Sequence, residues 1–218
     1  MGRLKIVHNK SPVLPSRVGL RYDSAMKTLV VVGLLLIAAV LSPAQTESKP
    51  EDGFISTENY TNAFFGFSVP FPRGIQLTLL KESAGAGQPY RRALFGVNSQ
   101  SKGYPVFVVL ADEIASSRIT DPKDALAALG AQKVRNTNLG GRDFAMGQSK
   151  SEGVYHVDYA TAAKGYMLYL SVFAYDKKVL ENFQHSIEAI EFFDPATAKQ
   201  HAGPDSRPYE GPPQGNER

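Results

Sequence analysis

Alternation of apolar and polar residues runs through the middle of the chain and predicts β-strands. In the stretch FFGFSVPFPRGI, the apolar residues Phe65, Phe67 and Val69 alternate with small or polar ones, which is the period of a half-buried strand. Pro70 and Pro72 lack a backbone donor, so strand pairing cannot continue through them. The next stretch, IQLTLL, follows at once, and the pattern therefore predicts a hairpin-like entry into a sheet.

Further strands are predicted downstream. Residues 106–110 are apolar on both faces, which is typical of a central strand covered on both sides. Two long hairpins follow, one turning at Gly140 and Gly141 and the other near Lys164 and Gly165.

A short helix is predicted between the central strand and the first long hairpin. Asp121 is placed to cap its N-terminus, Pro122 suits its first position and Gly130 its end. The apolar residues expected to pack on the sheet are Ala125, Leu126 and Leu129.

A second helix is predicted from Asp176 onward, before a last strand in IEAIEFF. Its apolar residues recur at helical spacing and are Val179, Leu180, Phe183 and Ile187. These elements predict one compact domain that contains both strands and helices.

Polar segments flank this domain on both sides. Residues 45–59 include TESKPEDG, which lacks apolar residues and reads as a solvated linker. Residues 195–218 are rich in Pro and Gly, with almost no large aliphatic residues. Such a segment buries too little apolar surface to offset its ordering entropy, so a disordered tail is expected.

The first 44 residues have the pattern of a basic leader and signal peptide. The apolar run Leu29–Leu41 covers roughly 20 Å as a helix, short of the roughly 30 Å hydrocarbon core of a bilayer. Small residues before Gln45 favour cleavage between Ala44 and Gln45. An uncleaved, single-span membrane anchor is the alternative, and Met26 is a second possible start. We expect a periplasmic or secreted protein.

Charge and cysteine content narrow the function classes. Six of the 24 Lys and Arg residues, but only one of the 21 Asp and Glu residues, lie in residues 1–44. The remaining chain then has 18 basic and 20 acidic residues, a net charge of −2. A nucleic-acid partner, which requires a basic face, is therefore not expected. The absence of cysteine excludes disulfides, thiolate metal sites and a cysteine nucleophile.

The stretch YTNAFFGFSVPFPRGI resembles the start of the PsbP-like domain family. The capped helix, the LGGRDF hairpin and the ending NFQHSIEAIEFF agree with that family over roughly Tyr60 to Asp194, although Ile75 stands where the family often has Trp. The resemblance implies an α+β fold over residues 60–194, a PsbP-like sandwich with a central, mainly antiparallel sheet flanked by helices. It also implies a role in association with other proteins. It supplies no catalytic residue, and fold alone does not determine function.

His156 and Asp158 are the first candidates for chemistry. They lie two residues apart on a predicted strand and hence on one face, where they could share a metal or transfer a proton. The simpler reading is that both are solvated, because Tyr155, Val157 and Tyr159 form the opposite, apolar face.

Tyrosines on the two long strands near the C-terminal helix are the second candidates. Tyr155, Tyr159 and Tyr169 belong to a dense tyrosine group that could form a binding surface or simply pack across strands.

Two functions therefore remain open. The first is a non-catalytic interaction or accessory module that docks on another, unidentified envelope protein. The second is a small-molecule or metal-binding domain that uses these tyrosines with His156 and Asp158. No catalytic residue or cofactor is predicted.

Overall fold

The computed structural model describes residues 48–80, 88–99 and 106–212. The predicted leader, with its cleavage between Ala44 and Gln45, lies outside the described residues. Within those ranges, no helix combines the length and the apolar character needed to cross a membrane.

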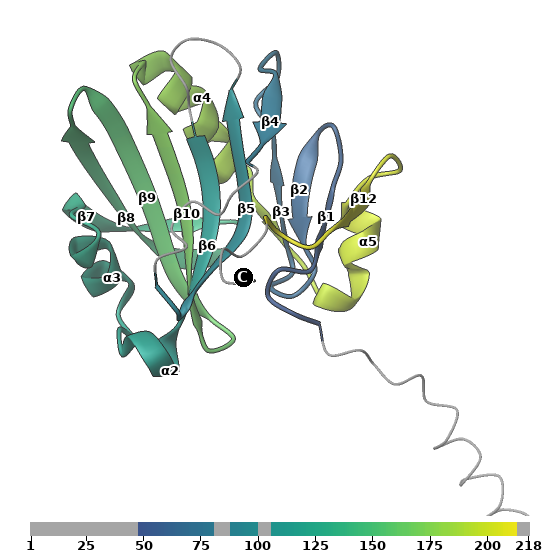
Figure 1. Ribbon diagram of the computed structural model, residues 1–218, viewed down its shortest axis with the longest axis horizontal. Coiled ribbons are helices and arrows are strands. Elements are labelled where there is room, and N and C mark those ends of the chain that lie inside the picture. The colour runs from purple at the N-terminus through teal and green to yellow at the C-terminus, as the bar shows by residue number, and fades with distance from the viewer. Residues whose placement is uncertain (1–47, 81–87, 100–105, 213–218) are drawn as a thin grey trace, which may run out of the picture. The chain divides into compact units, whose positions relative to one another are not determined.

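A large antiparallel sheet forms one layer of the domain (Figure 1). Its strand order is β4-β5-β6-β10-β9-β8-β7, and every neighbouring pair is antiparallel. The strands are β4 (Leu77–Leu79), β5 (Arg91–Ser99), β6 (Val106–Glu113), β7 (Gln132–Leu139), β8 (Arg142–Ser151), β9 (Val154–Ala163) and β10 (Tyr166–Ala174). The two predicted long hairpins, β7–β8 and β9–β10, are confirmed.

The predicted central strand is also confirmed. β6 lies third in the sheet, between β5 and β10, and the side chains from Phe107 to Leu110 are all buried. A strand whose two faces are both covered has no polar face, which explains its unbroken apolar run.

A second, five-stranded antiparallel sheet packs beside the first (Figure 1). Its strand order is β11-β3-β2-β1-β12. The strands are β1 (Gly53–Ile55), β2 (Asn59–Asn62), β3 (Phe67–Pro70), β11 (Glu191–Phe192) and β12 (Arg207–Tyr209).

The predicted hairpin between FFGFSVP and IQLTLL is wrong, because the two strands belong to different sheets. β3 pairs with β2 and β11, whereas β4 pairs with β5. Pro70 and Pro72 end the pairing of β3, and Gly74, at φ 75°, turns the chain toward the other sheet.

Both predicted flanking segments are wrong where the structure describes them. The expected linker, residues 45–59, contains β1, and the expected disordered tail, residues 195–218, contains β12. These two short strands pair with each other, and Tyr209 of β12 packs on aromatic rings of the core. Each segment is too polar to fold alone, but β1 and β12 pair with each other, and Tyr209 packs on two aromatic rings of the core.

Helices α2 (Ile114–Ser117), α3 (Pro122–Ala128), α4 (Lys177–Glu188) and α5 (Ala198–His201) and the 3-10 helix η1 (Pro195–Thr197) complete the fold. Asp121 and Asp176 cap α3 and α4 as predicted, each through a side chain that accepts backbone N–H groups. Leu129 was expected on the buried face of α3, but it caps the helix C-terminus and is 41% exposed.

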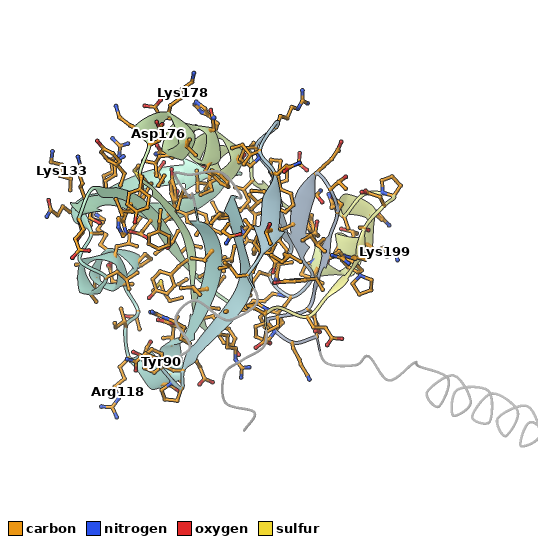
Figure 2. The ribbon with its side chains drawn as sticks, turned by 45° about the horizontal axis from the view of Figure 1, so that its top comes forward. Tyr90, Arg118, Lys133, Asp176, Lys178 and Lys199 are labelled. Carbon is orange, nitrogen blue, oxygen red and sulfur yellow. The ribbon has the colours of Figure 1, made fainter. Side chains whose placement is uncertain are left out.

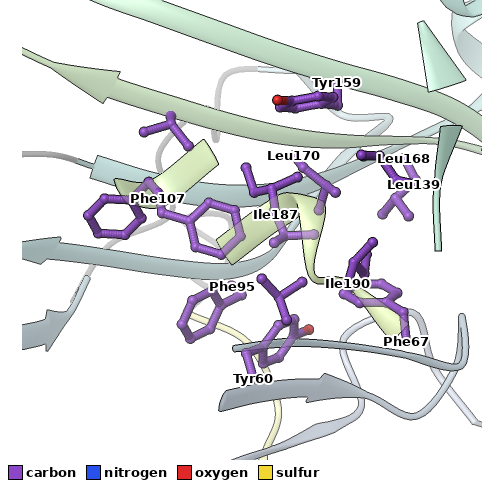
Figure 3. Packing of buried hydrophobic residues seen from close by; sticks show 14 of the residues in the cluster. Tyr60, Phe67, Phe95, Phe107, Leu139, Tyr159, Leu168, Leu170, Ile187 and Ile190 are labelled. Atoms are coloured by element: carbon purple, nitrogen blue, oxygen red, sulfur yellow. The ribbon is translucent and has the colours of Figure 1, made fainter. Parts of the chain in front are cut away.

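The packing of these elements confirms the α+β class, an antiparallel sheet flanked by helices. One face of the large sheet, called here the outer face, packs on α3 through Leu126. The opposite, inner face packs on the small sheet and on α4. Figure 3 shows this inner core, where the ring of Tyr60 from the small sheet stacks on Phe95 of the large sheet at 4.3 Å.

Candidate functional site

The structure separates the tyrosines that the sequence groups together. Tyr159 is buried in the inner core and Tyr169 is buried on the outer face, so the large sheet lies between them. Burial raises the pKa of both phenols. Tyr155 lies beneath Lys150, whose ammonium is 4.3 Å from the ring centroid and donates to the phenol oxygen. These three side chains therefore form no common platform.

His156 and Asp158 do share the outer face of β9, but the expectation that both are solvated is wrong for Asp158. That side chain is only 6% exposed, opposite Ser171 of β10 and Gly147 of β8. Burial raises the pKa of Asp158, and a hydrogen bond from Ser171 partly opposes the shift. The half-buried His156 ring contacts Phe173 edge-on, with 4.7 Å between centroids.

A metal site at this position lacks further ligands. Among the described residues, no group of three or more His, Cys, Asp or Glu side chains is arranged to hold a metal ion. Asp158 is buried because β9 lies in the interior of the sheet and α3 packs against β8 and β9 on this face. Alternation along one strand could not reveal this cover, which comes from a helix elsewhere in the sequence.

A second buried carboxylate lies on the same outer face. Asp112 of β6 accepts two hydrogen bonds from the Arg91 guanidinium of β5, both of 2.7 Å. These bonds raise the pKa of Arg91, whose guanidinium also lies 5.6 Å from the centre of the Tyr169 ring. Because both acceptor oxygens are paired, this group links two neighbouring strands and offers no free site.

A cleft of about 630 Å³ lies between the two sheets. It is lined by five parts of the chain, namely β1 with its turn into β2, the segment 70–75, β4, β5 and β12. β4 is an edge strand of the large sheet and β12 an edge strand of the small one. Strand edges of both sheets therefore border the same opening.

The cleft has an apolar floor. Ile55 and Val97 are buried beneath it, and Leu77 and Leu79 of β4 are half-buried at its side. Phe71 stacks on Phe95 of the core, with 5.7 Å between ring centroids. The floor is thus continuous with the inner core of the domain.

Charged side chains form the rim. Arg73, Glu58, Asp205 and Arg207 are all exposed and line the opening. Asp205 accepts hydrogen bonds from the backbone N–H and hydroxyl of Thr57, and these bonds lower its pKa. Neither arginine forms an ion pair with any residue that the structure describes.

The proline-rich segment 70–73 separates this cleft from a second, shallower depression of about 380 Å³. The far side of that depression belongs to α4, at Asn182, His185 and Ser186, and to Ala189, which caps the helix C-terminus. The two prolines fix φ in the segment, so the ridge keeps its shape between the two hollows. We call residues 70–73 the proline ridge.

Sequence reasoning identified the ridge as the end of a strand but missed the cleft. The cleft requires β12 and β1, which were expected to be unstructured, to stand opposite β4. Most other exposed cations, such as Lys133, Lys178 and Lys199, lie at the periphery of the domain (Figure 2) and do not line it.

Comparison with known proteins adds little. No family model matches the chain, and no curated protein matches it. The solution structure of cyanobacterial PsbP (CyanoP) from Synechocystis sp. PCC 6803 is similar, with a TM-score of 0.43 and 9% sequence identity over 71% of this chain and 99% of that chain. At that identity and TM-score, the likeness assigns no function to the chain.

Proposed function

We propose that this protein is an exported, non-catalytic interaction module, which binds an extended segment of another envelope protein in the cleft between its two sheets. The observation that carries the proposal is the cleft itself: an apolar floor continuous with the core, bordered by edge strands β4 and β12. Extended segments are commonly recognised by strand addition at a sheet edge, with pockets for alternate side chains.

The composition of the cleft favours binding over turnover. The titratable side chains that line it, Glu58, Arg73, Asp205 and Arg207, are exposed on its rim, and its floor is aliphatic and aromatic. A general acid or base is usually held in a cleft with its pKa shifted by burial or by a neighbouring charge. Asp205 lies exposed on the rim, and its bonds from Thr57 lower its pKa and so stabilise the ionised form.

The rigidity of the proline ridge supports the same function. A preformed ridge between two hollows loses little conformational entropy when a partner docks on it. The resemblance of residues 60–75 to PsbP-like domains agrees with a role in protein association. The basic leader with its short apolar run supports export, with the membrane-anchored form as the alternative.

The alternative of a small-molecule or metal-binding domain on the tyrosine strands has less support. Its proposed residues lie on opposite faces of the sheet or are already paired with neighbours. We keep the cleft as the binding site.

Chemical cross-linking in intact cells, followed by mass spectrometry, tests the association. The matched variants are Ile75→Glu, which places a charge in the cleft lining, and Leu129→Glu, at an exposed position on α3. We expect one protein to be cross-linked recurrently to the wild type and to Leu129→Glu, and much less to Ile75→Glu. Self-links alone, or equal partner yields from the two variants, would refute the proposal.

A further inference from the structure

The chemistry of the bound segment can be inferred from the cleft, on the premise that the proposed function holds. We propose that the segment alternates apolar and acidic residues, with its apolar side chains on the floor and its carboxylates at the two arginines of the rim.

The alternation follows from the geometry of the edge strand. Leu77 and Leu79, two residues apart on β4, both line the cleft. Side chains of an extended chain point alternately to opposite sides, so a segment lying along β4 has the same period. Every second side chain of the segment then faces the floor formed by Ile55 and Val97, and the residues between them face the rim.

The acidic character follows from the groups left open at the rim. The guanidinium groups of Arg73 and Arg207 form no hydrogen bond or ion pair with the residues described. Of the two rim carboxylates, Asp205 already accepts two hydrogen bonds from Thr57 on one oxygen. Two guanidinium forks are therefore open to a partner, together with the carboxylate of Glu58 and the second oxygen of the exposed Asp205.

Guanidinium groups select carboxylates more strongly than they select neutral acceptors. The planar fork matches the two oxygens of a carboxylate and forms charge-assisted hydrogen bonds with them. The carboxylate of Glu58 repels an acidic segment. Removing its charge and removing the charge of either arginine should therefore change the binding of such a segment in opposite directions. A purely apolar cleft predicts no such difference.

Three blocked peptides labelled with a neutral fluorophore test the inference by fluorescence anisotropy: Leu-Glu-Leu-Glu-Leu, Leu-Gln-Leu-Gln-Leu and Leu-Lys-Leu-Lys-Leu. The protein is purified after expression of the full chain. We expect the glutamate peptide to bind most tightly and the lysine peptide most weakly, with the preference reduced at high salt.

The rim variants decide the cause of that preference. Arg73→Gln and Arg207→Gln should each weaken binding of the glutamate peptide by about two- to fivefold, the range of exposed ion pairs. Glu58→Gln should strengthen it by a similar factor. All three should leave binding of the glutamine peptide unchanged, and because the positions are exposed, all three should keep the thermal unfolding midpoint of the wild type.

The possible results distinguish failure of this inference from failure of the proposed function. Equal binding of the three peptides, or rim variants without effect, would overturn the acidic segment and leave the cleft as an apolar docking site. A change of the same sign in Glu58→Gln and Arg73→Gln would overturn it as well. Failure of all three peptides to bind at millimolar concentration would contradict both proposals.

Discussion

Tyr209 is the residue of β12 that packs on the aromatic core, and its truncation should destabilise the fold. The half-buried ring contacts Tyr60 and Phe95 edge-on, with 6.0 and 5.8 Å between centroids. Truncation of a fully buried aromatic residue costs about 3–5 kcal/mol, and an edge-to-face pair contributes about 0.5–1.5 kcal/mol. Because Tyr209 is partly exposed, we expect Tyr209→Ala to cost about 2–3 kcal/mol of unfolding free energy.

Tyr209→Phe is the matched control. Among the described residues the phenol oxygen is buried without a hydrogen-bond partner. Removing an unpaired buried polar group is close to neutral or stabilising, so this variant should stay within about 0.5 kcal/mol of the wild type or exceed it.

Urea unfolding measures both effects. At constant slope, the midpoint of Tyr209→Ala should fall clearly, and its thermal midpoint should drop by about 5–10 °C. A loss below about 0.5 kcal/mol for Tyr209→Ala would refute the reasoning, since it would mean that the C-terminal segment does not pack on the core.

The remaining predictions concern the outer face of the large sheet and the turn between β2 and β3. Burial raises the pKa of Asp158, so its protonated form contributes stability that is present below the unfolded pKa and is lost as pH rises through the folded pKa. Asp158→Asn should therefore raise the thermal midpoint at neutral pH, and this gain should shrink as the medium is acidified. A gain independent of pH would contradict the assignment. Leu126→Ala should cost about 2–4 kcal/mol because that side chain is fully buried between α3 and the sheet, whereas Leu129→Ala should cost under about 0.5 kcal/mol. Equal losses in urea unfolding would show that α3 is misplaced. Gly66→Ala should destabilise strongly, because φ is 70° there and a Cβ atom would meet the Phe193 carbonyl oxygen. An unchanged thermal midpoint would count against this turn.

Local signals predicted most of the large sheet and both of its main helices. Asp121 and Asp176 mark helix starts through hydrogen bonds within one turn, and the two long hairpins turn where the sequence provides residues suited to positive φ. Such features depend on neighbours in the sequence, so a single sequence contains them.

The small sheet could not be predicted in the same way. β1 and β12 are three residues long and lie far apart in the chain, each within a largely polar segment. Each is a strand because the other is present and because Tyr209 of β12 packs on Tyr60 of β2, the strand on the far side of β1. Their stability is a property of the assembled domain, and composition alone suggested disorder.

In the candidate site, too, features set by neighbouring residues could be predicted and features set by distant segments could not. The proline ridge was visible in the sequence as the end of a strand, whereas the cleft depends on the unpredicted β1 and β12. The burial of Asp158 depends on cover from α3 and on its small neighbours Gly147 and Ser171. Periodicity along β9 placed Asp158 on the correct face but could not show that this face is covered.

A photo-reactive residue placed in the cleft gives the most direct test of the central claim, that a partner protein binds between β4 and β12. The probe replaces Ile75, which lines the cleft, and in a control it replaces Leu129, which is exposed on α3. After irradiation of intact cells, we expect one recurrent protein adduct from position 75. The probe in this adduct should be attached to an extended segment of the partner that contains apolar and acidic residues. Position 129 should not give that adduct. The same adduct at equal yield from both positions, or no protein adduct from position 75, would contradict the claim.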